Sequence, residues 1–286
     1  MAQLDLWGNP VEEKELLIDK FIEVPFSTLN ARGGRWQARK SKWLSLGIKS
    51  ELGRDAKCIA QGLNKFDPRD SYTGTSVFDS ALCELMYSWF CPDNGDILDP
   101  FCGGSVRGIV ANYLGYHYTG IDIRQEQIDS NKEQAETILS SDNQPIYYVG
   151  DSNKVLDNID DKFDFVFSCP PYADLEVYSD LDGDISNMKY DDFMVAYTSI
   201  ISKSCKLLKD GGYACFVVGE VRDKKGNYIG FVPDTINAFK SCGMKYYNEM
   251  ILLENGLNTA AMRADKQFTS SKKVVKVHQN VLVFKK

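Results

Sequence analysis

The feature that most constrains the fold is an alternation of short β-rich runs with helical stretches between residues 95 and 285. Strands that alternate with helices are typical of a mostly parallel sheet with helices on both faces. The last two runs have no helical stretch between them, so we expect an antiparallel edge there. The seven expected strands span residues 95–101, 118–123, 145–152, 163–169, 213–221, 247–254 and 280–285.

The chain divides by pattern into two parts. Residues 1–70 show only weak helical spacing and a short apolar patch, so we expect an N-terminal appendage there. Residues 71–286 are expected to form one large α/β domain, whose first helix begins near a capping Ser76 or Asp79. The remaining expected helices span residues 105–115, 125–140, 190–209 and 233–243.

Composition excludes several classes of protein. No apolar run approaches the ~18–20 residues of a membrane span. The first residues show no basic region leading into an apolar stretch, so we expect a cytoplasmic protein without a membrane partner. The chain has eight cysteines without a close Cys-x-x-Cys pair and only two histidines. We therefore expect free, mostly buried thiols and no metal site.

Acidic residues end three successive expected strands, where ligands bind in open α/β sheets. The first strand ends in a loop that contains Asp99, Phe101 and Gly103, and glycine lets the backbone approach a ligand closely. Asp122 follows 23 residues after Asp99, a separation that suits an acid binding the ribose hydroxyls of an adenosine. Asp151 ends the third strand, where its carboxylate can accept from the adenine amine.

Two cofactors compete for such a site. A dinucleotide places an anionic pyrophosphate on the glycine loop, where Asp99 would repel it. S-adenosylmethionine instead offers a cationic amino group and a sulfonium, which suit an aspartate. The loop also lacks the third glycine of the dinucleotide motif. One such acid alone is most simply a surface carboxylate, but three at successive strand ends predict an S-adenosylmethionine site.

The fourth expected strand runs directly into Pro170, Pro171 and Tyr172. Two prolines fix an extended turn and remove two amide donors, but their carbonyls remain as acceptors. Such acceptors suit an exocyclic base amine, whose lone pair is delocalised into the ring until the nitrogen is held pyramidal. Tyr172 can stack on a base that has flipped out of a duplex. The turn therefore predicts amine methylation by positioning and electrostatics, without a covalent intermediate.

These motifs resemble those of the DNA amino-methyltransferases of phage and bacterial type, which modify adenine N6 or cytosine N4. Their first motif, Asp-Pro-Phe-x-Gly-Ser-Gly, is similar to residues 99–105. Their catalytic motif, [Asp/Asn/Ser]-Pro-Pro-[Tyr/Phe/Trp], is similar to residues 169–172, within a longer resemblance at residues 168–180. The likeness extends over residues 20–286.

The resemblance implies a Rossmann-like, class I S-adenosylmethionine-dependent methyltransferase fold with a seven-stranded, mostly parallel sheet. It also implies double-stranded DNA as the partner. Residues 75–105 resemble the helix-and-strand block that forms part of the cofactor pocket in this family, which implies that Thr75 and Ser76 approach the methionine carboxylate. The expected cofactor-binding residues are Thr75, Ser76, Asp99, Phe101, Gly103, Asp122, Asp151 and Ser168. The expected catalytic residues are Cys169, Pro170, Pro171 and Tyr172.

Two positions depart from the family pattern. Gly103-Gly104-Ser105 replaces Gly-Ser-Gly, and Cys169 replaces Asp, Asn or Ser. Cysteine is a weak acceptor, so the methylated atom stays open between cytosine N4 and adenine N6. A Cys169 thiolate also allows C5 methylation of cytosine, with Glu220 at the end of the fifth strand as its partner. Amine methylation is favoured, because C5 enzymes usually carry their cysteine after one proline.

The net charge of −7 disfavours nucleic acid as a partner, but residues 31–54 and 255–279 are locally basic. We expect these two segments to grip phosphates. Trp36 and Trp43 could stack on bases, although packing of the appendage is the favoured role.

We also expect residues 172–192 to form a wall or lid over the target base, with Tyr178 exposed. Two other classes of protein remain open. One is an RNA or protein-glutamine methyltransferase, and the other is a non-catalytic protein that binds the cofactor or DNA.

Overall fold

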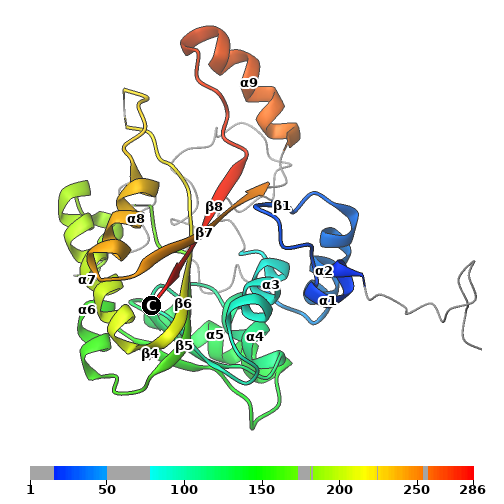
Figure 1. Cartoon of the computed structure of the whole chain (residues 1–286), viewed down its shortest axis with the longest axis vertical. Coiled ribbons are helices and arrows are strands. Elements are labelled where there is room, and N and C mark those ends of the chain that lie inside the picture. Colours follow the sequence, from blue (N-terminus) through cyan, green and yellow to red (C-terminus); the bar gives the residue numbers. More distant parts are fainter. Residues whose placement is uncertain (1–15, 50–77, 173–180, 182, 224, 254–256) are drawn as a thin grey trace, which may run out of the picture.

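The computed structural model describes residues 16–49, 78–172, 181, 183–223, 225–253 and 257–286. At its centre lies an eight-stranded sheet in the order β1-β7-β8-β6-β5-β2-β3-β4 (Figure 1). The strands are β1 (Thr28–Asn30), β2 (Asp96–Asp99), β3 (His117–Asp122), β4 (Ile146–Val149), β5 (Phe163–Ser168), β6 (Leu208–Val218), β7 (Lys245–Leu253) and β8 (His278–Lys285).

The strand order defines the fold class. Strands β6, β5, β2, β3 and β4 are parallel neighbours, and the chain crosses over between β4 and β5 to the other side of β2. Strand β8 is antiparallel to both of its neighbours, β6 and β7. This is the Rossmann-like sheet of class I S-adenosylmethionine-dependent methyltransferases, so the expected fold class is confirmed.

The sheet corrects two details of the sequence-based prediction. It has eight strands instead of seven, because β1, from the segment expected to be an appendage, pairs in parallel with β7. The antiparallel strand β8 lies between β6 and β7 and not at an edge, and helix α9 (Leu257–Ser271) precedes it. The sequence pattern did not reveal these two elements, because β1 has only three residues and most residues of α9 are polar. The expected boundary at residue 70 lies outside the described residues.

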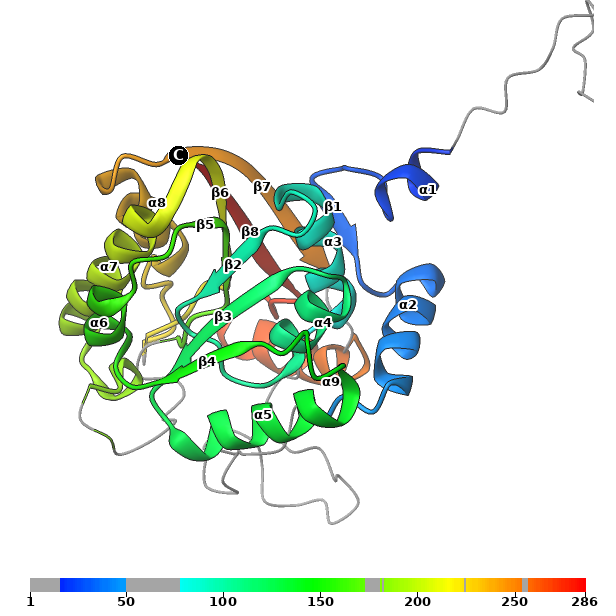
Figure 2. The same ribbon diagram turned by 90° about the horizontal axis from the view of Figure 1, so that it is seen from below.

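Helices cover the sheet in two layers (Figure 2). One layer contains α3 (Ser80–Phe90), α4 (Val106–Tyr113) and α5 (Gln125–Ile138), and the other contains α6 (Ser152–Val155), α7 (Tyr190–Leu207) and α8 (Phe231–Ser241). The 3-10 turns η2 (Leu156–Asn158) and η4 (Ile185–Asn187) lie on the second side. Two N-terminal helices, α1 (Leu17–Phe21) and α2 (Gly34–Ser45), flank α3.

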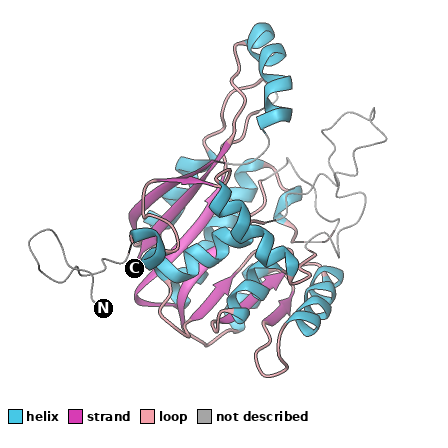
Figure 3. Cartoon of the chain, turned by 90° about the vertical axis from the view of Figure 1, so that its right-hand side faces the viewer, coloured by secondary structure: helices cyan, strands magenta, loops and turns pink. Residues whose placement is uncertain are grey.

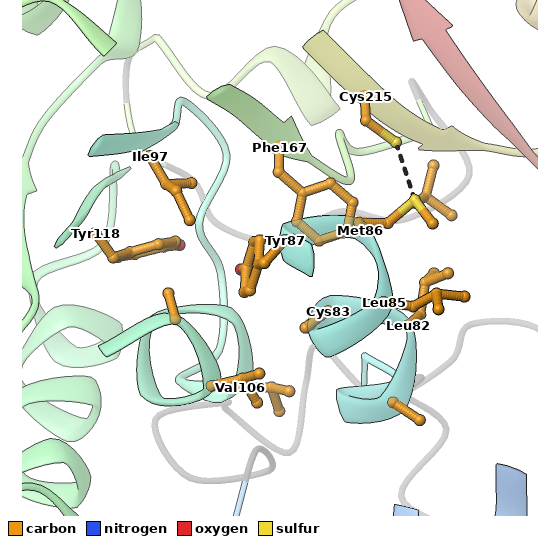
Figure 4. Close-up of a cluster of buried hydrophobic side chains, with 14 of the residues drawn as sticks. Leu82, Cys83, Leu85, Met86, Tyr87, Ile97, Val106, Tyr118, Phe167 and Cys215 are labelled. Carbon is orange, nitrogen blue, oxygen red and sulfur yellow. Dashed lines mark hydrogen bonds between the residues drawn. The ribbon is translucent and has the colours of Figure 1, made fainter. Parts of the chain in front are cut away.

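Alternation along the strands divides the core between the two layers. Phe165 and Phe167 of β5 belong to the cluster under α3 and α4, whereas Val166 belongs to the cluster under α7 and α8. Successive side chains of a strand point to opposite faces, so a strand buried on both faces is apolar throughout. In the first cluster, Tyr87 stands against Phe167, and the Cys215 Sγ lies 3.7 Å from the Met86 Sδ (Figure 4).

Both tryptophans of the basic segment pack against α3, as favoured from the sequence. Trp36 and Trp43 are buried, and their indole Nε1 groups donate to Asp79 at 3.2 Å and to Glu84 at 2.8 Å. Asp79 is also the N-cap of α3 and accepts from the amides of Ala81 and Leu82. Asp79 therefore begins α3, and Asp79 and Glu84 together anchor α2 beside it.

In the portion of the chain that the structure describes, no helix combines the length and apolarity needed to cross a membrane. The seven cysteines in that portion carry free thiols, and five of them are buried. Cys58 lies outside the described residues.

Removing the Phe167 ring should destabilise the protein strongly, because this fully buried ring contacts Tyr87, Phe165 and Phe78. We expect Phe167→Ala to lower the free energy of unfolding in urea by about 3–5 kcal/mol. Phe26→Ala is the matched control, since Phe26 is 67% exposed. Its effect should stay within about 0.5 kcal/mol. Equal effects of the two variants would contradict the described core.

Candidate active site

A cavity of about 600 Å³ opens at the carboxyl ends of β2, β3, β4 and β5. Eight of the residues predicted from the sequence line it together: Phe101, Gly103, Asp122, Asp151, Cys169, Pro170, Pro171 and Tyr172. The expected cofactor and catalytic motifs, which are separated by tens of residues in the chain, therefore share one cavity. Thr75 and Ser76 lie outside the described residues.

Three amide donors of the loop after β2 are engaged within the protein. The amide of Phe101 donates to Asp99, that of Cys102 to the Ile121 carbonyl and that of Gly103 to the Asp122 Oδ2, at 3.1, 2.9 and 3.1 Å. Gly103 has φ +48°, a conformation that favours glycine. These three amides therefore already have acceptors within the protein.

Asp122 links the loop to the end of β3. Its Oδ1 accepts from the Arg124 amide at 2.9 Å, and its Oδ2 accepts from Gly103. Burial raises the pKa of this carboxyl above its ordinary value, while the bonds from Arg124 and Gly103 act in the opposite direction. Arg124 continues into a buried chain of polar groups through Gln127 and Asn131, and the Asn131 amide donates back to the Gly103 carbonyl at 2.6 Å.

Asp99 lies behind the cavity wall, which corrects the expectation of direct cofactor contact. Its carboxylate is fully buried and accepts from the Arg107 Nε at 2.5 Å, the Tyr118 hydroxyl at 2.7 Å and the Ser168 Oγ at 2.5 Å. Burial raises the pKa of Tyr118 well above its ordinary value, so this hydroxyl stays a donor. Ser168 is equally buried, so neither Asp99 nor Ser168 lines the cavity. The neutralising Arg107 is the reason that Asp99 can be buried.

Arg107 is the main site residue that sequence reasoning missed. It lines the cavity, donates to the Phe101 and Cys102 carbonyls at 2.6 and 2.9 Å, and lies 4.6 Å from the centre of the Phe78 ring. One signal was available, because Arg107 is a lone charge in the otherwise uncharged helix α4. A buried charge is retained only when it is paired, so its partner had to be an acid nearby.

The Pro-Pro-Tyr turn joins both sides of the core. Ser168 anchors it to Asp99, Pro170 is buried, and Cys169 is half-buried against the cluster under α3. The Tyr172 ring meets Phe231 edge-on at a centroid distance of 5.8 Å. The Tyr172 ring is thus supported by α8 from behind and still lines the cavity.

The opposite wall consists of residues at the end of β4 and in the loop before η4. Asp151 caps α6 through the Asn153 amide, and the Ser152 Oγ donates to the Pro100 carbonyl at 2.6 Å. Gly183 and Asp184 from the expected lid segment also line the cavity. Tyr178 and its neighbours at 173–180 lie outside the described residues.

Glu220 does not line the cavity beside Cys169. Its Oε1 accepts from the amides of Gly230 and Phe231 at 3.1 and 2.8 Å, which caps the beginning of α8. A capping carboxylate at a helix N-terminus has a sufficient structural role. The glutamate that C5 methylation would need is therefore engaged elsewhere.

No protein-family model and no curated protein matches the chain. Similar solved structures include TrmN from Thermus thermophilus, with 13% identity and a TM-score of 0.49 over 73% of this chain and 49% of TrmN. ChlM from Synechocystis PCC 6803, the magnesium protoporphyrin IX methyltransferase with bound S-adenosylmethionine, has 12% identity and a TM-score of 0.47 over 87% and 94%. A TehB-like S-adenosylmethionine-dependent methyltransferase from Corynebacterium glutamicum has 18% identity and a TM-score of 0.44 over 74% and 90%.

The chain spans about half the length of TrmN. At identities of 12–18% these likenesses concern the fold and say nothing of a substrate. The chemistry of this chain is therefore argued from its own cavity.

Breaking the buried Arg107–Asp99 pair should destabilise the protein, because Asp99 would keep a buried charge without its cation. We expect Arg107→Met to lower the free energy of unfolding by about 3–5 kcal/mol. Lys154→Met removes the cation of the exposed Lys154–Asp151 pair and serves as the control. Its cost should stay below about 1 kcal/mol, and urea denaturation measures both. Equal stability of the two variants would contradict the anchoring role of Asp99.

Proposed function

We propose that the chain transfers the methyl group of S-adenosylmethionine to an exocyclic amine of a flipped nucleic-acid base, in DNA. One observation supports the proposal above all. The Pro-Pro-Tyr turn at 170–172 and the acids Asp122 and Asp151 line the same cavity. A base-amine site and an adenosine site are thereby next to each other, as a direct transfer requires.

The cavity suits S-adenosylmethionine better than a dinucleotide. Its volume of about 600 Å³ lies within the usual range for small-molecule sites. The amides of Phe101, Cys102 and Gly103 are engaged, so they do not offer the donors that a pyrophosphate requires. S-Adenosylmethionine has no phosphate, so it does not need these donors. This loop geometry replaces the repulsion by Asp99 that the sequence suggested, because Asp99 is buried and paired.

Residues of this chain would bind the adenosine of the cofactor and the target base. Asp122 and Asp151 are placed to accept from the ribose hydroxyls and the adenine amine. Backbone carbonyls of the Pro-Pro turn would accept from the target amine, and Tyr172, supported by Phe231, would stack on its base. S-Adenosylmethionine bound there would supply the electrophilic methyl group and would leave as the neutral thioether, while the proton of the amine would pass to solvent.

The structure bears on the choice between amine and C5 methylation. C5 methylation would use Cys169 as a nucleophile together with a nearby glutamate. Because Glu220 caps α8, the residues lining the cavity favour the amine. RNA as the substrate and a non-catalytic role are outcomes of the experiment below.

The basic charges favour one of the two expected DNA-gripping segments. In 31–54, Arg39 and Lys40 pair with Glu84 and Asp79, so these cations help to join α2 to α3. In contrast, α9 and the segment after it stand away from the layered core (Figures 1 and 3). Lys266 and Lys272 are exposed there, and Gln279, the last residue of this part of the chain, lines the cavity. We therefore place the phosphate contacts on this arm, residues 257–279.

Tyr172→Ala should lower methyl transfer by roughly a hundredfold, because the target base loses its stacking surface and alignment. The measurement incubates the protein with methyl-labelled S-adenosylmethionine and, in parallel reactions, mixed-sequence duplex DNA or RNA. Each nucleic acid is then digested to nucleosides, and the labelled base is identified by mass spectrometry. Tyr148→Ala is the control, since Tyr148 lies on the edge strand β4 and does not line the cavity.

Label on N6-methyladenine or N4-methylcytosine would support the proposal and identify the target atom. Label on C5-methylcytosine would make Cys169 a nucleophile instead. Label on RNA but not on DNA would identify RNA, and not DNA, as the substrate. Cofactor binding without label on either nucleic acid would favour the non-catalytic alternative.

Neutralising the arm should reduce the salt dependence of DNA binding. We expect the Lys266→Gln, Lys272→Gln, Lys273→Gln variant to lower the slope of log K against log salt by about 0.9 for each phosphate contact removed. A second triple variant, at the exposed lysines Lys132, Lys206 and Lys240, makes the same change in net charge. Fluorescence anisotropy over a salt series compares the two, and identical slopes would exclude the arm as the phosphate contact.

A further inference from the structure

We propose that Lys40 and Asp79 bind the zwitterionic amino-acid end of the cofactor, a role that rests on the function proposed above. Both residues line the cavity, although Lys40 comes from the N-terminal helix α2. The sequence suggested phosphate contacts for the basic segment 31–54, and the structure directs this lysine toward the cavity instead.

The two side chains form a half-buried ion pair. The Lys40 Nζ donates to the Asp79 Oδ2 at 3.1 Å, and the side chains are 28% and 15% exposed. The other oxygen of Asp79, Oδ1, accepts from the Trp36 indole and from the amides that begin α3. Asp79 is thus held rigidly, with Oδ2 directed at the lysine.

The position of the pair fits the amino-acid end of the cofactor. Asp122 and Asp151 mark the adenosine end, beyond β3 and β4, and the Pro-Pro-Tyr turn marks the methyl acceptor beyond β5. Asp79 follows Phe78, whose ring packs against Arg107, the residue that holds the loop after β2. The pair therefore lies beside the central loop, on the α3 side of the cavity.

Charge complementarity selects the amino-acid group for this place. A lysine ammonium has three N–H donors, and within the described residues Lys40 donates one hydrogen bond, to Asp79. Its remaining donors suit an α-carboxylate, while the Asp79 Oδ2 suits an α-ammonium. Arg107, another cation of the cavity wall, is already bonded to Asp99 and two carbonyls.

Calorimetric titration of the full chain with two ligands isolates this contact. S-Adenosylhomocysteine and 5′-methylthioadenosine share the adenosine and a neutral thioether, but only the first carries the amino-acid group. We expect Lys40→Met to weaken S-adenosylhomocysteine by about tenfold to a hundredfold, the size of a lost charge-assisted hydrogen bond, and to leave methylthioadenosine unchanged. Lys40→Arg should retain most of the affinity. Lys42→Met, on the exposed side of the same helix, should change neither ligand.

Equal affinities of wild type and Lys40→Met for S-adenosylhomocysteine would overturn the proposal, as would an equal loss for both ligands. Unchanged affinity for S-adenosylhomocysteine with weakened DNA binding would make Lys40 a phosphate contact instead. A wild-type chain that binds neither ligand would overturn the proposed function as well. If Lys40→Met weakens only S-adenosylhomocysteine but the wild type transfers no methyl group, the binding role of Lys40 is supported and only the proposed reaction is contradicted.

Discussion

The buried carboxylate of Asp99 joins the two halves of the site. It accepts from Arg107 of helix α4, from Tyr118 of the neighbouring strand β3 and from Ser168, which ends β5 just before Cys169 and the Pro-Pro-Tyr turn. A charge this deeply buried is tolerated only with a close cation and satisfied lone pairs, so the four groups hold one arrangement. The distance between the loop after β2 and the Pro-Pro-Tyr turn is thereby set inside the core, beneath the cavity that both of them line.

The loop above Asp99 shows how the same fold can prefer one cofactor. Three of its amides are bonded to Asp99, Ile121 and Asp122, and the Asn131 side chain donates to the Gly103 carbonyl. A dinucleotide site leaves such amides open for phosphate, whereas here they hold the protein's own groups. The acids that remain at the cavity wall suit an adenosine, and the proposed Lys40–Asp79 pair would receive an amino acid. Selectivity in this proposal follows from which donors are engaged in advance.

Much of this could be predicted from the sequence, and the failures have physical causes. The seven strands and the cavity residues at their ends follow from alternation and spacing, because parallel strands place their carboxyl ends at one edge. Strand β1 escaped notice because three residues with one buried Leu29 carry no period. Asp99 was placed in the cavity because spacing along a chain does not say whether a side chain faces a ligand or an arginine. The pairing of Arg39 and Lys40 with Glu84 and Asp79 could not be predicted either, because a count of charges does not identify their partners.

By itself, the sequence determined the α/β class, the glycine loop, the acids at successive strand ends and the Pro-Pro-Tyr turn, because each depends on local spacing and backbone chemistry. Tertiary structure alone decided which of these groups face the cavity. It buried Asp99 with Arg107, turned Glu220 into the cap of α8 and brought Lys40 to the cavity from α2. These outcomes depend on pairings between residues tens of positions apart, and such pairings exist only once the sheet and its helices have packed together.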